Sequence, residues 1–218
     1  MTTLLLAEHD DATIKESTAR ALTAAMALGG DVHVLVAGKD CRVAATAAAK
    51  LAGVAKVLHA DGDALAHQLS EPLAALIVSL AGGYEALVAA ATATGKTVMP
   101  RVAAFLDVMQ VSEIVKVVAP DTFERPIYAG NALETVKIGD AKRVITVRAA
   151  AFKPAGEGGT APVETVAVPA TRQPSTFVGA ELTRSERPDL TAARVVISGG
   201  RAFQSAENFR KYLEPLAD

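Results

Sequence analysis

The fold is indicated most clearly by one stretch near the end of the chain, RVVISGGRAFQSAENF at residues 194–209. A β-branched run comes first, followed by two glycines, an arginine and a helical pattern that begins after Ser205. A strand followed by a tight turn and then by the first turn of a helix is the arrangement with which α/β folds hold phosphates. The stretch therefore predicts the outline of a nucleotide-binding site.

The turn in this stretch, Gly199–Arg201, carries the chemistry expected of such a site. Glycines let the backbone approach an anion closely, and the guanidinium of Arg201 offers several planar donors. Ser205 is a good N-cap, with Glu207 in the favourable first turn of the helix. The same residues also fit an ordinary strand-to-helix turn with a solvated arginine, and the spacing alone leaves both interpretations open.

The rest of the chain alternates apolar strands with alanine-rich helices. In the helix expected over residues 13–28, apolar side chains recur at three- and four-residue spacing before Gly29-Gly30. Such alternation predicts an α/β fold with a mostly parallel sheet and helices on both faces, in three layers. The expected strands are 3–8, 32–36, 55–59 and 87–90, and the other expected helices are 42–51, 64–80 with Pro72 interrupting or kinking it, and one entered through 92–106.

From Val111 onward the pattern changes to short strands separated by turns. Arg125-Pro126-Ile127-Tyr128 places an arginine and an aromatic ring beside a rigid turn, which suits an interface with another domain or subunit and equally a surface hairpin. Residues 153–162 predict a flexible connection, and the polar stretch 184–188 predicts a domain linker. The expected strands are 111–118, 127–128, 133–138, 143–148, 163–168 and, more weakly, 177–182.

Length and charge restrict the class of protein. A chain of 218 residues allows one large α/β domain or a domain plus a fragment. The net charge of −2, with both signs interspersed, gives no basic surface for nucleic acid or anionic lipid. No apolar run reaches the roughly 18 residues of a membrane span, and Leu4-Leu5-Leu6 follow Met1 too closely for a signal or transit peptide. We therefore expect a soluble cytoplasmic protein without direct membrane insertion, although a mature protein of the mitochondrial matrix would look similar.

The usual catalytic and metal-binding patterns are missing from the sequence. No serine lies in a Gly-x-Ser-x-Gly elbow, and the single cysteine, Cys41, has no recognisable partner pattern. We expect its thiol to be packed or idle, in a reducing compartment. The histidines show no paired ligand spacing, and two of them lie within apolar strands, where structural roles are expected. We therefore predict no catalytic residue and no metal site; the histidines are His9, His33, His59 and His67.

Gly95-Lys96-Thr97 has the end of a phosphate-binding P-loop but not its beginning. That loop needs a glycine five positions before Gly95, where this chain has Ala90, so we exclude an ATPase of this type. Other polar residues here are interpreted as helix caps and solvated charges, or as the lining of a surface groove: Thr92, Thr94, Lys96 and Arg101.

Four stretches of the sequence resemble the α subunit of electron-transfer flavoproteins. VVISGGRAFQSAENF at 195–209 is similar to the start of that subunit's FAD domain, and this motif is fairly specific to the family. The other three are TATGKTVMPRVAAFLDV (92–108), PDTFERPIYAGNALETVK (120–137) and AAFKPAGEGG (150–159). The resemblance spans nearly the whole chain.

The resemblance implies an electron carrier in which FAD does the redox chemistry, so acid and base groups are not needed. Arg201 matches the family's FAD-binding arginine after Gly199 and Gly200, and a cation there would offset the charge of a phosphate or of reduced flavin. The resemblance also implies an αβ heterodimer with AMP in the β subunit. Electrons would enter from acyl-CoA and related dehydrogenases of fatty acid β-oxidation and leave to a membrane quinone oxidoreductase.

The expected domains follow from this resemblance. Residues 1–188 would form an amino-terminal α/β domain with its linker, and residues 189–218 the first strand and helix of a second, doubly wound FAD domain. The residues after Pro188 are too few for an independent core, so we expect an incomplete domain and a chain that alone binds FAD poorly. Two other functions remain open: a stand-alone adenine-nucleotide-binding or hydrolase-like α/β domain, and a structural subunit that docks a partner.

Overall fold

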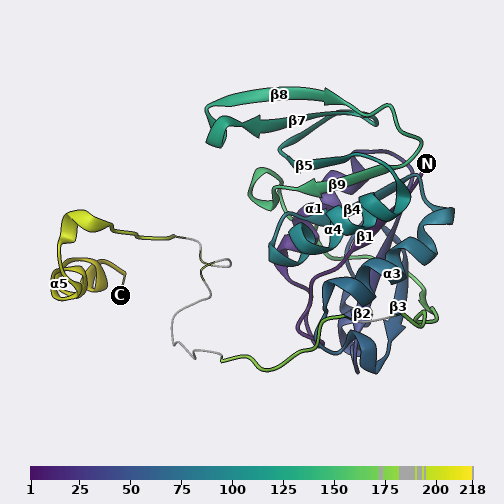
Figure 1. The fold of residues 1–218 in the computed structure, drawn as a ribbon, viewed down its shortest axis with the longest axis horizontal. Helices are drawn as coiled ribbons and strands as arrows, with labels where there is room; N and C mark the ends of the chain where they lie inside the picture. The colour runs from purple at the N-terminus through teal and green to yellow at the C-terminus, as the bar shows by residue number, and fades with distance from the viewer. Residues whose placement is uncertain (172–173, 182–189, 191–192, 194, 218) are drawn as a thin grey trace. The chain divides into compact units, whose positions relative to one another are not determined.

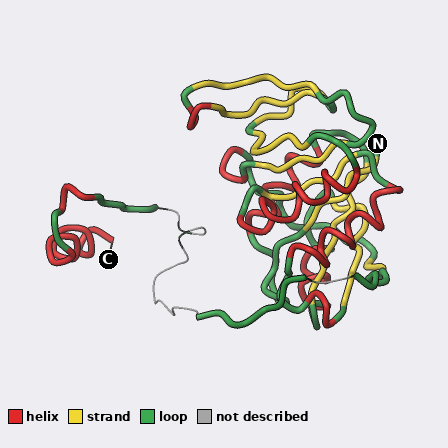
Figure 2. The backbone as a smooth tube through the Cα atoms, viewed as in Figure 1, coloured by secondary structure: helices red, strands yellow, loops and turns green. Residues whose placement is uncertain are grey.

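The computed structural model describes residues 1–171, 174–181, 190, 193 and 195–217 (Figures 1 and 2). The chain divides into two units, Met1–Phe177 and Val178–Asp218. Both sheets belong to the larger unit, and the described part of the smaller unit contains one 3-10 turn and one α-helix. The linker expected at 184–188 lies outside the described residues.

A seven-stranded sheet forms the centre of the larger unit. Its order is β10-β3-β2-β1-β4-β9-β5, and all neighbouring strands are parallel. Every residue of β4 is buried, because a central parallel strand is covered on both faces. The predicted parallel sheet is confirmed. Its strands are β1 (Thr2–Leu6), β2 (Asp31–Gly38), β3 (Val54–Asp61), β4 (Ala86–Ala90), β5 (Gln110–Ile114), β9 (Arg143–Val147) and β10 (Val163–Thr165).

Helices cover both faces of this sheet, which confirms the predicted three layers (Figure 1). One apolar cluster joins Leu5 of β1 to α1 (Glu16–Met26) and α2 (Arg42–Ala48). The other cluster joins Leu4 to α3 (Ser70–Leu80) and α4 (Ala93–Leu106). Leu4 and Leu5 lie in different clusters because successive side chains of a strand point to opposite faces. Among the described residues, no helix is both long and apolar enough to span a bilayer.

The helix expected over 64–80 is divided into two pieces. A 3-10 turn, η1 (Asp63–Leu65), comes first, and α3 begins only at Ser70. Gln68 between them has a φ of 49°, a left-handed conformation that a right-handed helix cannot pass through. Pro72 does not cause the break, since it lies in the first turn of α3, where N–H groups have no intrahelical acceptor.

A small antiparallel sheet follows β5 in the chain. Its order is β6-β7-β8, and its strands are β6 (Lys116–Ala119), β7 (Thr122–Ile127) and β8 (Ala132–Lys137). The single strand expected at 111–118 is therefore wrong, because β5 and β6 belong to different sheets. The strand expected at 127–128 is the end of a longer one, and Tyr128 begins a 3-10 turn, η3 (Tyr128–Gly130).

Pro126 is tolerated in the middle strand of this small sheet. β6 pairs with β7 only as far as Glu124, whereas β8 continues alongside Pro126 through Leu133. One side of Pro126 is therefore a free edge, where the missing N–H breaks no ladder bond.

The sequence predicts a flexible connection at 153–162, which we name the strap. In the structure this segment is instead held by hydrogen bonds. Its backbone is bonded to α1 and to the residues just after α2, and a Cβ on Gly159 would overlap the carbonyl of Leu51. The absence of a side chain at Gly159 thus permits a close approach. The N–H groups of Ala155, Gly158, Gly159 and Ala161 donate to the carbonyls of Ala19, Lys50 and Ala49 over distances of 2.9–3.1 Å.

The strap leads to β10, which pairs with β3 at the opposite edge of the sheet from β5. The strand expected at 163–168 is confirmed in part, because β10 ends at Thr165. The weaker strand expected at 177–182 is absent from its described part, 177–181, and Leu182 lies outside the described residues.

The smaller unit contains the 3-10 turn η5 (Arg201–Phe203) and the helix α5 (Ala206–Ala217). The predicted helix is confirmed. The predicted strand before it is wrong over 195–198, and Arg194 lies outside the described residues. A strand needs a neighbour for its N–H and C=O groups, and no described segment pairs with this one.

Candidate functional site

The predicted phosphate-binding turn, Gly199–Arg201, lies in the smaller unit just before α5. Gly199 faces the interior of this unit, since a Cβ there would overlap the ring of Phe203 and lie 2.7 Å from Leu213 Cδ1. Packing therefore requires a glycine at this position. Gly200 has open space where its Cβ would be, and its carbonyl accepts the N–H of Phe203 at 3.1 Å.

Ser205 begins α5 as the sequence predicts. The N–H of Asn208 donates to Ser205 Oγ at 3.1 Å, which is the hydrogen bond of an N-cap. Asn208 Nδ2 also donates to the carbonyl of Phe203 at 3.0 Å. The ring of Phe203 packs edge-on against Phe209, with centroids 6.1 Å apart. The turn and the first turns of α5 therefore form one packed piece.

A surface hollow of about 600 Å³ lies beside this turn. Arg201 is exposed there, and its side chain makes no hydrogen bond or ion pair with any described residue, so its guanidinium is free to bind an anion. Free donors beside aromatic rings suit a ligand with both an anionic and an aromatic part. The hollow is lined by Gly200, Arg201, Phe203, Gln204, Ser205, Ala206, Phe209, Arg210 and Glu214, so Gly199 is the one predicted site residue outside it.

The larger unit also contains the place where α/β sheets usually bind ligands. β2 lies on one side of β1 and β4 on the other, so the switch point is beyond the carboxyl ends of β1 and β4. Glu8 occupies this place. Its carboxylate accepts hydrogen bonds from Thr92, the N-cap of α4, and from Ser17 of α1 at 2.7 Å. A carboxylate therefore already uses donors that a phosphate would need.

The P-loop-like stretch has structural partners, and the cap expected at Thr92 is confirmed. Thr92 Oγ1 accepts the N–H of Gly95 at 3.4 Å, and a Cβ on Gly95 would overlap the carbonyl of Ala90. Lys96 forms an ion pair with Glu113. Thr97 Oγ1 donates to the carbonyl of Thr94 at 3.0 Å. The glycine here serves helix-to-strand packing.

Glu113 is the centre of a charged group beside a second hollow, of about 340 Å³. Its carboxylate contacts Lys96 Nζ and lies 2.5 Å from Arg148 Nη2. The hydrogen bond from Lys96, followed by that from Arg148, lowers the pKa of Glu113. Of the four polar residues considered for a groove, Lys96 lines this hollow, whereas Arg101 instead lies 5.2 Å from the ring of Phe105.

Three histidines have structural contacts. His9 Nδ1 accepts the N–H of Asp11 at 3.1 Å, and Nε2 lies 3.0 Å from the carbonyl of Ala37. The ring of His67 stacks on Phe177 at 3.8 Å. His33 Nδ1 lies 2.9 Å from the hydroxyl of Tyr84, which confirms the structural role expected of His33.

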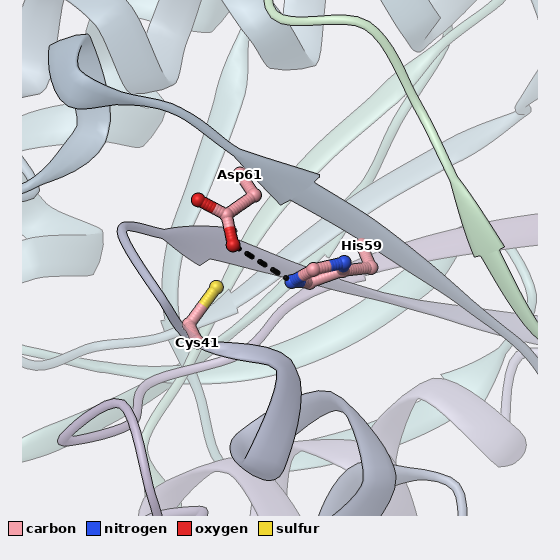
Figure 3. Close-up of side chains that lie close together, drawn as sticks. All are labelled: Cys41, His59 and Asp61. Atoms are coloured by element: carbon pink, nitrogen blue, oxygen red, sulfur yellow. Dashed lines mark ion pairs between the residues drawn. The ribbon is translucent and has the colours of Figure 1, made fainter.

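The remaining histidine, His59, converges with Cys41 and Asp61 at the carboxyl end of β3 (Figure 3). The sulfur, one imidazole nitrogen and one carboxylate oxygen lie within 4.8 Å of one another. His59 and Asp61 share a face of β3 because they are two residues apart, and Cys41 lies just before α2. We name these three residues the β3-end cluster.

Burial favours the uncharged forms of the two buried members of the β3-end cluster. Burial is the main cause that lowers the pKa of His59. Burial, followed by the charges of Asp61 and Asp11, raises the pKa of Cys41 to about 11. A protonated, buried thiol is not an activated nucleophile.

Comparison with known proteins decides the family. A model of the electron transfer flavoprotein domain matches residues 3–171, most of the chain. This chain belongs to the electron transfer flavoprotein family. Among its relatives, the electron transfer flavoprotein subunit alpha of Bradyrhizobium diazoefficiens is 67% identical over 218 residues, covering 100% of this chain and 69% of that protein.

Two further relatives show how widely electron transfer flavoprotein sequences resemble this one. The subunit alpha of Pseudomonas aeruginosa is 54% identical over 219 residues, covering 100% of this chain and 71% of that protein. The protein named probable electron transfer flavoprotein subunit alpha, mitochondrial, of Caenorhabditis elegans is 42% identical over 219 residues, covering 99% of this chain and 66% of that protein. The family model ends before Gly199–Arg201, whereas the first two of these relatives match the chain through it.

Sequence reasoning missed Glu8 and the β3-end cluster. Glu8 had a usable signal, since an acidic residue directly after the first strand of an α/β fold lies near the switch point. For the β3-end cluster, spacing reveals only that His59 and Asp61 share a face of the strand, because Cys41 meets His59 through the pairing of β2 with β3.

Proposed function

We propose that this chain is the α subunit of an electron transfer flavoprotein and that its smaller unit contributes to an FAD site through Gly199, Gly200 and Arg201. The observation that carries the proposal is the 67% identity, over the whole chain, to a protein of that name. The free guanidinium of Arg201 beside the hollow supports it, because this group is available to an anionic ligand.

Each residue of the turn has a defined task in this proposal. FAD, when bound, supplies the redox chemistry. Arg201 holds negative charge through planar donors, either of a phosphate or of the reduced ring system. Gly200 lets the backbone approach the ligand, and Gly199 allows the turn to pack onto Phe203 and Leu213. The exposed ring of Phe209 offers an apolar wall to the hollow.

We also propose a heterodimer with a β subunit that holds AMP. The words "subunit alpha" in the relatives' names support a partner of this kind. The small sheet offers it exposed apolar residues, which we name the hairpin patch: Val118, Tyr128 and Leu133, whose residue exposures are 50%, 79% and 65%. Val118 lies on β6, Tyr128 begins η3 and Leu133 lies on β8, and exposed apolar side chains on one small sheet are typical of interaction sites.

The electron donors that we propose are acyl-CoA and related dehydrogenases of fatty acid β-oxidation, and the acceptor is a membrane quinone oxidoreductase. These follow from the sequence resemblance. The cytoplasm is the proposed compartment; the mitochondrion, printed in the name of the Caenorhabditis elegans relative, is the alternative.

The alternative function, a stand-alone adenine-nucleotide-binding or hydrolase-like domain, is disfavoured by Glu8. A nucleotide phosphate at the switch point would meet this carboxylate, which already binds Thr92 and Ser17. The negative charges of a phosphate and a carboxylate in contact repel each other strongly. We therefore expect no ATP binding by the chain.

Assembly and flavin retention test the proposal. The 218-residue chain is mixed with the β subunit of the same organism and FAD, and the product is analysed by size-exclusion chromatography and flavin absorbance. We expect a one-to-one complex. In that complex Arg201→Ala is expected to weaken FAD retention roughly 10- to 100-fold, as for the loss of a charged hydrogen bond. Lys211→Ala is the matched control, because it removes a cation of α5 that does not line the hollow.

The chain alone is expected to retain little FAD. In the described part of the smaller unit only Leu213 is buried, so the hollow is not enclosed. Stoichiometric flavin on the isolated chain would contradict this expectation. Failure to assemble with the β subunit, or binding and hydrolysis of ATP by the chain alone, would contradict the proposed function.

A further inference from the structure

The donor atoms of the β3-end cluster face one common point (Figure 3). Cys41 Sγ, a nitrogen of His59 and a carboxylate oxygen of Asp61 lie within 4.8 Å of one another, and His59 Nε2 is 3.5 Å from Asp61 Oδ2. They come from rigid elements, β3 and the start of α2. Thiolate, imidazole and carboxylate are the three side-chain ligands that zinc takes in proteins.

The imidazole of His59 lacks the contacts that a buried structural histidine normally has. Its residue exposure is 4%, and neither ring nitrogen has a hydrogen-bond partner among the described residues. Buried polar groups in native proteins are nearly always satisfied, and each exception needs a reason. A cation at the point where the cluster converges would supply the missing partner for one nitrogen.

The surroundings of the cluster favour a cation. Asp61, Asp11 and Asp40 all act electrostatically on the sulfur of Cys41, while Arg42 and His9 are the positive groups that act on His59. The Asp61 side chain is 36% exposed, so an ion can reach the cluster from solvent past this carboxylate. The N–H of Asp40 donates to Asp61 Oδ1 at 3.1 Å, which holds the carboxylate in place.

We propose that Cys41, His59 and Asp61 bind a divalent transition-metal ion of the Zn²⁺ class, with water as the fourth ligand. Ligand bonds of about 2.0–2.3 Å require the donors to move closer together, to roughly 3.5 Å, through rotation of the three side chains, of which Asp61 is the most exposed. The sulfur binds as thiolate, and its proton leaves to solvent. Nothing is oxidised or reduced.

A Cys-His-Asp catalytic group fits the geometry less well. Such a group needs the nucleophile and the carboxylate on opposite nitrogens of the imidazole. Here Asp61 lies against Nε2, and Figure 3 shows the sulfur of Cys41 on this same side of the ring. Cys41 is also fully buried, with its thiol 3.8 Å from the carbonyl of Ala60. All three side chains therefore converge on one point, as ligands do.

Metal titration of the untagged chain tests this proposal independently of flavin. Zn²⁺ is titrated by calorimetry, and Co²⁺ is used as an optical probe for a sulfur-to-metal charge-transfer band. We expect one ion per chain, and at least a tenfold loss of affinity in Cys41→Ser, His59→Asn and Asp61→Asn, since even outer-sphere changes cost about 10–100-fold. Cys41→Ser is expected to abolish the charge-transfer band.

Two control variants are expected to bind like the parent chain. Asp63→Asn removes an exposed carboxylate two residues away that pairs with Lys39, and His67→Gln removes a histidine outside the cluster. Circular dichroism checks that each variant folds. Asp61→Asn changes a partly exposed side chain, so it leaves the hydrophobic core intact. Absence of Zn²⁺ binding, or equal affinity in Asp61→Asn and Asp63→Asn, would overturn the proposal.

Discussion

His33 shows how burial of one side chain makes stability depend on pH. Its ring lies edge-on to Tyr84 with centroids 5.5 Å apart, and Nδ1 is within hydrogen-bond distance of the tyrosine hydroxyl. Burial, followed by the charge of Lys56, lowers the pKa of His33. The folded state therefore favours the neutral imidazole.

The sign of the pH effect follows from this direction. Because its folded-state pKa is lowered, His33 contributes stability at pH values above its ordinary pKa of about 6.5. This stability is lost as the pH falls from 6.5 towards the folded-state pKa. We expect the free energy of unfolding, measured with urea, to decline between about pH 7.5 and 5.5. His33→Gln should make the decline shallower without removing it, because the pKa of His59 is lowered as well. An unchanged slope in His33→Gln, with His67→Gln as control, would contradict the assignment.

Single residues were predictable where the signal is local. Ser205 and Thr92 were identified as caps, and both form the expected hydrogen bonds, because a cap acts within three residues of itself. Asp61 was not identified at all. His59 lies two residues before it on β3, but Cys41 reaches it only through the register of β2 against β3, which a sequence pattern does not specify.

At the scale of elements, Gly95 is a helix position where we expect glycine to be more stabilising than alanine. Alanine normally stabilises a helix interior by up to about 1 kcal/mol relative to glycine. A Cβ at Gly95 of α4 would instead overlap the backbone of Ala90 in β4. We expect Gly95→Ala to lower the free energy of unfolding by about 1–3 kcal/mol, as overpacking does.

Urea unfolding of a second glycine variant provides the comparison. A Cβ at Gly82, in the 3-10 turn η2 (Ala81–Gly83), meets nothing within 4 Å. Gly82→Ala should therefore stay within about 0.5 kcal/mol of the parent chain. Stabilisation by Gly95→Ala would show that α4 can move away from β4.

Two elements that sequence reasoning misjudged depend on features that local composition does not reveal. Glycines in the strap were interpreted as flexibility, but Gly159 serves a close contact with the carbonyl of Leu51. Helix composition continued past Gln68, but the backbone turns there into a left-handed conformation. In both places tertiary contacts or a single backbone angle decided the structure, whereas the repeated alternation of strands and helices was long enough to predict.

For the whole molecule, the hairpin patch gives the proposed β subunit a place to bind. We expect Leu133→Asp and Tyr128→Asp to weaken assembly roughly tenfold or more, because buried aromatic and apolar anchors carry most interface energy. The affinity is measured by analytical ultracentrifugation. Val43→Asp, at a side chain 62% exposed on α2, is the matched control and should assemble normally. Equal affinity in all three variants would place the interface elsewhere.

The architecture of the whole chain was predictable in outline. The three layers followed from periodicity, and the family followed from motifs such as VVISGGRAFQSAENF. The predicted strand at the start of that motif was wrong over 195–198, because a strand depends on neighbours that local sequence does not reveal.

The position of β10 has a consequence for synthesis on the ribosome. The outer edge of β3 obtains its neighbour only from Val163–Thr165, about a hundred residues later in the chain. Until the nascent polypeptide has emerged that far, β3 presents an uncapped row of N–H and C=O groups, the template for intermolecular sheet growth. Closing so long a loop is slow, so we expect the growing chain to be prone to misassembly until the strap has docked.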